Sequence, residues 1–415
     1  MAHISIAEVK ENMILADTLI DRNGCILLNK GTTLTPNHLR ILEMRGIAEV
    51  PVEKASPDRT DDNCQENPEA RSRAESLARL RFCHTDLEHP FMSALFRIAV
   101  SRKTIELEQE TVPSRNGGET SFPSSTAPPP ITITSDKLLD LIKNDVRLPT
   151  LLSIYKKINE VIMDPGSSAH TIADVIGKDS SLTARLLKLV NSSFYGFPSK
   201  IETLSRAVAI VGTRQLSMLT AGIDIVNSFT HIPSDVIDIK SCWRHNIACG
   251  ALSRVLAGCK NIENSERIFV GGLLHDIGRL VLYNYAPRQS AYLLAESRSR
   301  SRLLDSYEQE MLGYTHAFLG GLLLKRWKLP LSLESMVMNH HRPDPSQYHL
   351  ETAIVHVADI IVNALEIGSS GESLVPPLDP EAWKRIDLPT AALPSAIDQM
   401  ECQVDEVLQF FISGI

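Results

Sequence analysis

Histidine and aspartate side chains recur through the second half of the chain, inside stretches that are otherwise apolar. They are His245, His275, Asp276, His316, His340, His341 and Asp359. Ionisable groups are costly to bury unless they are paired or bound to metal, so these residues are expected to meet one another. Neutral imidazoles and carboxylates are good ligands for iron, manganese or zinc, as one or two ions. Two adjacent ions could activate a water molecule and bind a phosphoryl oxygen, which is the chemistry of phosphoester hydrolysis.

Helical spacing places several of these residues on faces that point toward a core. His245 shares a face with Cys249 at a step of four, and His316 begins an apolar stripe of the same kind. A second interpretation is a core in which the histidines are only hydrogen-bonded, the more common role of a single histidine on an apolar face. The sequence leaves both interpretations open. His356, three residues before Asp359, is a weaker candidate, which would contact a metal ligand rather than bind the metal itself.

The order His, His-Asp, His, His-His, Asp resembles the order of metal ligands in the HD superfamily of metal-dependent phosphohydrolases. Shorter motifs resemble one branch of it, the HDOD family, named for its HD-related output domain. In order they are Leu148-Pro149-Thr150, Ile172–Ile176, Leu186–Ser192, Ala207–Gly212, Phe269–Arg279, Trp327–Pro330 and His340-His341. The resemblance implies an all-helical domain in a bacterial signal-transduction protein. Such a domain regulates a partner protein, generally without an assigned catalytic activity.

Two departures from catalytic relatives bear on activity. HD-GYP phosphodiesterases are similar at His275-Asp276 but have lysine where Arg279 stands, and the two cations differ in donor geometry. After the paired histidines those enzymes have a Gly-Tyr-Pro motif, whereas this chain continues Arg342-Pro343. A non-catalytic regulator is therefore favoured. The alternative is a metal-dependent phosphohydrolase acting on a cyclic dinucleotide or another nucleotide, with His275, Asp276 and Arg279 as candidates for catalytic roles.

The composition of the chain argues against several other classes of protein. The 415 residues carry a net charge of −8, which argues against a general nucleic-acid binder. One short helix of a helix-turn-helix-like pair has only Arg185 and Lys188 as basic residues, so direct DNA binding is not expected. The seven cysteines form no C-x-x-C pair, and neither a signal peptide nor a membrane span is indicated. These features favour a cytoplasmic protein that binds a signalling partner and no membrane.

The fold class expected is mainly α, with five segments. They are 1–53, a small α+β module; 54–110, a helical connector; 111–130, a flexible linker; 131–365, the HDOD-like domain; and 366–415, helices packing on it. In the module, Asn23-Gly24 predicts a hairpin, Thr35-Pro36 a helix start and Ile47–Val52 a strand. The module resembles the segment ahead of some HD-GYP domains. Pro90 predicts a break between two connector helices.

Beyond residue 131 the apolar spacing is almost wholly helical. Helices are predicted at about 171–176, 181–190, 204–211 and 213–229, separated by glycine and proline breaks.

Overall fold

The computed structural model describes residues 67–110, 153–164, 168–197, 199–229, 232–262 and 265–412, with isolated stretches of the first 52. The predicted linker at 111–130, the domain boundary near 131 and the helix start at Thr35-Pro36 lie outside the described residues. The segment limits given above therefore stay predictions.

The N-terminal module contains two short antiparallel pairs. Strand β1 (Ala2–Ser5) pairs with β4 (Glu49–Val52), and β2 (Leu19–Ile20) pairs with β3 (Ile26–Leu28). The second pair flanks the Asn23-Gly24 step, and β4 confirms the predicted last strand. Strand β1 was not predicted, because four residues are too few to show a period of two.

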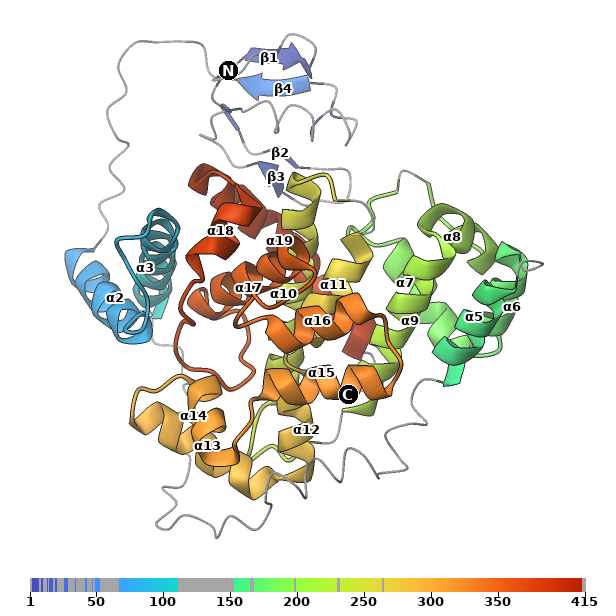
Figure 1. The fold of residues 1–415 in the computed structure, drawn as a ribbon. Coiled ribbons are helices and arrows are strands. Elements are labelled where there is room, and N and C mark those ends of the chain that lie inside the picture. The colour runs from blue at the N-terminus through green and yellow to red at the C-terminus, as the bar shows by residue number, and fades with distance from the viewer. Residues whose placement is uncertain are drawn as a thin grey trace.

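Two helices follow the module, as the position of Pro90 predicts. Helix α2 (Pro68–Arg81) starts where Asn67 accepts a hydrogen bond from the backbone of Glu69, and α3 (Pro90–Glu110) starts at the proline itself. Phe91 at the start of α3 is fully buried and lies 4.3 Å, between ring centroids, from Trp383 near the C-terminus. This pair of helices is therefore packed against the main core (Figure 1).

The next five helices form one side of the molecule, drawn in green in Figure 1. They are α5 (Ser153–Met163), α6 (Ala169–Gly177), α7 (Ser180–Val190), α8 (Leu204–Val211) and α9 (Thr213–Ser228). Side chains of Ser168, Asp179 and Thr203 cap α6, α7 and α8. The four helices predicted between residues 171 and 229 are confirmed.

Helix α10 (Ile239–Cys259) runs through the centre of the fold, and most of its side chains are buried. The helices after it are α11 (Ser265–Leu274), α12 (Ile277–Tyr285), α13 (Pro287–Ser299), α14 (Leu304–Leu312), α15 (His316–Arg326), α16 (Leu331–Asn339) and α17 (His349–Ala364). Helix α10 contacts α11 and α17 directly. Burial on nearly every side along most of its length places this helix at the centre of the core.

Glycines allow two of these contacts to be unusually close. A Cβ at Gly278 of α12 would collide with the carbonyl of His316, the first residue of α15. A Cβ at Gly272 of α11 would lie 2.8 Å from the carbonyl oxygen of Cys249 on α10. Both contacts draw the segment between α11 and α12 toward its neighbours, and that segment contains His275 and Asp276.

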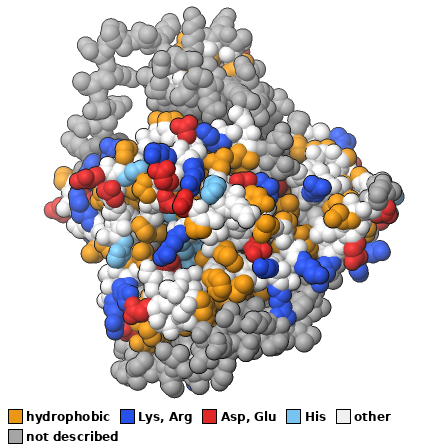
Figure 2. Space-filling model, viewed as in Figure 1, with side chains coloured by type: hydrophobic (Ala, Val, Ile, Leu, Met, Phe, Trp, Pro, Cys, Tyr) orange, Lys and Arg blue, Asp and Glu red, His pale blue; other side chains and the backbone are white. Residues whose placement is uncertain are grey.

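The chain ends in α18 (Pro380–Ile386), the 3-10 turn η3 (Thr390–Ala392) and α19 (Leu393–Ile412). Helix α19 packs along α10 and buries Val404, Val407 and Phe411. Among the described residues, no helix combines the length and apolar character that crossing a bilayer requires. In the view of Figure 2, basic and acidic side chains are mixed over the described surface without forming one basic face.

Candidate metal centre

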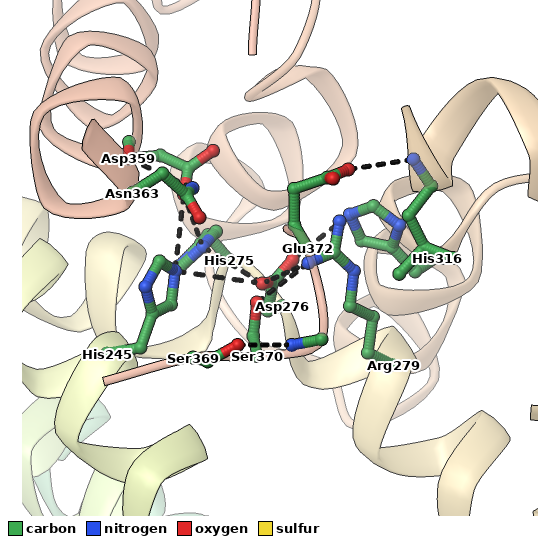
Figure 3. Close-up of polar contacts among 12 residues, drawn as sticks. His245, His275, Asp276, Arg279, His316, Asp359, Asn363, Ser369, Ser370 and Glu372 are labelled. Carbon is green, nitrogen blue, oxygen red and sulfur yellow. Dashed lines mark hydrogen bonds and ion pairs between the residues drawn. The ribbon is translucent and has the colours of Figure 1, made fainter. Parts of the chain in front are cut away.

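The seven predicted histidines and aspartates come from five separate places in the chain and meet in the core (Figure 3). His245 lies on α10, and Asp359 lies on α17. His275 and Asp276 occupy the break between α11 and α12, and His316 begins α15. The pair His340-His341 follows the end of α16. All but His341 are at most 3% exposed, and His341 is partly exposed.

One half of the cluster surrounds Asp359. Its Oδ1 lies 3.2 Å from Nε2 of His245 and 3.4 Å from Nε2 of His275. Oδ2 of Asp276 lies 3.3 Å from Nε2 of His275 and 3.9 Å from Nε2 of His245. Sγ of Cys249, a residue not predicted as a ligand, lies 3.6 Å from Nε2 of His245.

The other half surrounds His316. Its Nε2 lies 3.0 Å from Oδ1 of Asp276, 3.3 Å from Nε2 of His340 and 3.1 Å from Nε2 of His341. Asp276 therefore faces both halves, with one carboxylate oxygen toward each. A carboxylate in this position suits the bridging of two ions.

The ring orientations are fixed by hydrogen bonds at the opposite nitrogen. Nδ1–H of His275 donates to the carbonyl of Gly272 at 2.6 Å, and Nδ1–H of His340 donates to the carbonyl of Val337 at 2.8 Å. Nδ1–H of His316 donates to Oε2 of Glu308 at 2.6 Å. Such bonds leave Nε2 as the lone-pair nitrogen and are typical of metal-binding histidines.

These orientations make the donor set fit a cation. Nε2 of His275 and Oδ1 of Asp276 are buried and have no hydrogen-bond partner among the described residues. The Nε2 atoms of His316 and His340 face each other, although each ring carries its proton on Nδ1. Donors bound about 2.1 Å from one ion lie roughly 3.0–3.4 Å apart, which matches the closest separations here.

Without a cation, protons would have to neutralise the cluster. Burial by itself lowers the pKa of His275, but the charge of the adjacent Asp276 and the hydrogen bonds that a protonated Nε2 would donate to both aspartates outweigh it and raise the pKa to about 10. Burial also lowers the pKa of His340, and the neighbouring imidazoles His275 and His316 add to this effect, so the value falls to about 3. A metal ion would replace the proton on His275.

Arg279, on the first turn of α12, is bound within the cluster. Its Nη1 donates to Oδ2 of Asp276 at 3.1 Å and to Oγ of Ser370 at 2.7 Å. Burial works to raise the pKa of Asp276, but Arg279 and the histidines hold it well below its usual range. Asp276 therefore stays a carboxylate.

Residues 366–378, here called the covering loop, lie over the cluster (Figure 3). The Ser370 carbonyl accepts from the hydroxyl of Tyr283 at 2.6 Å, and Glu372 accepts from the backbone of Leu304 at 2.7 Å. Gly371 has φ +112, which few other residues adopt. Arg81 at the end of α2 donates to the Ser373 carbonyl at 3.2 Å, so the connector helix also fixes the loop.

Two cavities flank the covering loop, and Glu372 lines both. One has a volume of about 840 Å³ and includes Arg81, Arg244 and Asn363 in its lining. The other is about 110 Å³, and His341 lines it. His341 is thus the predicted ligand with a path toward solvent.

Three further residues form hydrogen bonds around the cluster without belonging to the donor set. His356 is not part of the donor set, because Nδ1 donates to the His340 carbonyl and Nε2 accepts from the backbone of Asp379. Asn363 donates to Oδ1 of Asp359 at 2.7 Å. Glu308 was missed by sequence analysis, since nothing links it to His316 before the turn between α14 and α15 is known.

Comparison with known proteins gives a family match. Residues 148–343 match the family model of the HDOD domain. An uncharacterized protein of Treponema pallidum is 27% identical over 228 residues, which cover 53% of this chain and 43% of that relative. The match thus spans less than half the length of the relative.

Solved structures share the fold at low identity. An HDOD domain protein of unknown function from Geobacter sulfurreducens has a TM-score of 0.54 at 23% identity, covering 66% of this chain and 98% of that one. A proposed phosphohydrolase from Shewanella amazonensis has a TM-score of 0.52 at 21% identity, covering 66% and 97%. A proposed signal transduction protein from Marinobacter aquaeolei has a TM-score of 0.51 at 18% identity, covering 66% and 64%.

Proposed function

We propose that this protein, which belongs to the HDOD family through residues 148–343, is a signal-transduction regulator that acts on a partner protein without catalysis. Its place would be the cytoplasm of a bacterium. The metal centre would then hold five separate chain segments in one arrangement, and the surface above them would bind the partner. A bound ion of this kind contributes directly to folding free energy.

The contact between Arg279 and Asp276 carries this proposal. A hydrolytic centre needs an open coordination position for water and a path for substrate. Here the guanidinium takes one oxygen of the aspartate that would bridge two ions, and Ser370 holds the guanidinium from the covering loop. Both side chains are at most 2% exposed.

The second candidate function is a metal-dependent phosphohydrolase acting on a cyclic dinucleotide or another nucleotide. The complete series of seven donors favours it, as does the cavity that reaches His341. In that case an ion near His316, His340 and His341 would supply a water nucleophile. Iron, manganese and zinc all suit imidazole and carboxylate donors.

The test combines hydrolysis with complementation. The full-length protein, loaded separately with zinc, manganese or ferrous iron, is assayed against a panel of cyclic dinucleotides. We expect no turnover near an enzymatic rate of about 1 per second. In a strain lacking the gene, His341→Ala should lose signalling output only as far as it loses thermal stability, because a structural ligand acts through the fold. Turnover by the wild type, with both turnover and complementation lost in His341→Ala, would establish the hydrolase instead.

A further inference from the structure

We propose that Cys249 is a metal ligand, and that with His245, His275 and Asp359 it forms a closed four-coordinate site for zinc or ferrous iron. This inference deepens the proposed function, because a site with no open position stabilises a fold rather than activating water. It also means that the two halves of the cluster differ in their donor atoms, because only the half around Asp359 contains sulfur. The half around His316 contains imidazoles and one oxygen of Asp276.

The position of Cys249 on α10 follows from helical geometry. It lies four residues after His245, so both side chains leave the same face of the helix about one turn apart. Gly272 allows α11 to approach the backbone at Cys249, which brings His275 to that face. Asp359 reaches it from α17, and the thiol itself is fully buried.

The distances fit one tetrahedral ion. With sulfur about 2.3 Å and nitrogen or oxygen about 2.1 Å from zinc, tetrahedral geometry puts sulfur roughly 3.6 Å from nitrogen and nitrogen roughly 3.4 Å from oxygen. Sγ of Cys249 lies 3.6 Å from Nε2 of His245 and 4.0 Å from Oδ1 of Asp359. The two nitrogen–oxygen separations are 3.2 and 3.4 Å. All four donor atoms lie within 4.8 Å of one another.

A separate observation indicates that a ligand belongs here. Nε2 of His275 is a buried nitrogen for which the described residues offer no hydrogen-bond partner, while its Nδ1 is already bonded to Gly272. The nitrogen faces Asp359 and the space beside His245. A cation bound between these donors would give this nitrogen a partner.

Arg279 explains why a thiolate would be used. One oxygen of Asp276 is bonded to the guanidinium, and the other is closest to His316. The fourth donor for the half around Asp359 is then supplied by sulfur. On binding, the S–H bond breaks, the sulfur–metal bond forms and the proton leaves to the buffer. Thiolate ligands favour zinc, cobalt or ferrous iron over magnesium and manganese.

Cobalt(II) is the probe, because sulfur bound to it gives a near-ultraviolet charge-transfer band that nitrogen and oxygen ligands do not give. The metal-free full-length protein is titrated with cobalt as the wild type, as Cys249→Ser and as Cys242→Ser. Cys242 is the matched control, since it is equally buried on the same helix and lies outside the donor set. We expect the band in the wild type and in Cys242→Ser. Cys249→Ser should lose the band, and its zinc affinity should fall about tenfold or more.

Three outcomes would overturn the inference: no binding of cobalt or zinc, cobalt bound without the band, or the band retained in Cys249→Ser. If Cys249→Ser does not fold, X-ray absorption of the zinc-loaded wild type decides, with one sulfur at about 2.3 Å expected. The absence of sulfur would refute the inference. Hydrolysis measured on the same samples separates the two proposals. Turnover in a protein that shows the band would contradict the non-catalytic regulator but leave Cys249 as a ligand. Absence of both turnover and the band would contradict the Cys249 ligand but leave the regulator.

Discussion

Nη1 of Arg279 lies 3.1 Å from Oδ2 of Asp276, and neither side chain is more than 2% exposed. The pair is separated by three residues across the start of α12, so local geometry alone brings it together. The cation is nevertheless also bonded to Ser370, 91 residues later. One arginine thereby connects the aspartate at the centre of the cluster to the loop that covers it.

Replacing Arg279 by alanine should destabilise the metal-free protein by about 3–5 kcal/mol, because it leaves the Asp276 carboxylate buried without its partner. In zinc-loaded protein the loss should be smaller, since the ion compensates the same charge. Denaturant unfolding with and without zinc measures both values. Arg206→Ala, at an exposed arginine, is the control. Equal losses in the two forms would contradict binding of the ion beside Asp276.

The double substitution His275→Ala/Asp276→Ala should act through stability. A buried polar cluster that loses members leaves others unsatisfied, at about 1–3 kcal/mol each. The thermal midpoint and the binding of the signalling partner should therefore fall together. Calorimetry and a binding titration on the same samples test this. Unchanged partner binding together with lost hydrolysis would indicate an enzyme.

Glu308→Ala should weaken zinc binding by about 10–100-fold, although Glu308 is not itself a proposed ligand. Its carboxylate holds the ring of His316 through Nδ1 and also accepts from the His316 backbone at 2.8 Å. Competition with a chelator measures the affinity. Glu310→Ala, two residues away and exposed, should leave it unchanged.

Asp224 on α9 should make stability depend on pH. Burial raises its pKa from 3.8 to about 7, and Asp179 adds to the shift. A raised carboxyl pKa means that the folded state binds the proton more tightly, so stability falls as pH rises from about 4 to 7. Asp224→Asn should flatten this slope and raise stability at pH 8 by roughly 1–3 kcal/mol. Unfolding at pH 5 and pH 8 tests it, with Asp235→Asn, at an exposed carboxylate, as control.

The meeting of the seven histidines and aspartates could be predicted because its signal is local. Histidines and aspartates inside apolar helical runs have to be paired somewhere, and their order resembles that of a known ligand series. The helices around them show clear periodicity, and glycine and proline mark their ends. The asparagine–glycine step likewise predicted the β2–β3 hairpin from neighbouring residues alone.

The supporting contacts were not predictable in the same way. Glu308 is a surface-type residue by composition, and only the turn before α15 brings it to His316. Ser370 lies in a stretch of glycine and serine that predicts a loop and nothing more. Cys249 was visible on the face of His245, but a buried cysteine is usually a small apolar side chain. Each became notable through contacts across 8 to 110 residues of sequence.

The loop contacts of Arg81 have a practical consequence for anyone dissecting the molecule. The family match ends at residue 343, whereas Asp359, Ser370 and Glu372 follow it and Arg81 precedes it by more than sixty residues. A fragment trimmed to the matched region would lose one proposed ligand and the whole covering loop. One that kept residues 131–412 would retain the loop but not the arginine that anchors it. Inactivity of either fragment would therefore say nothing about the intact chain.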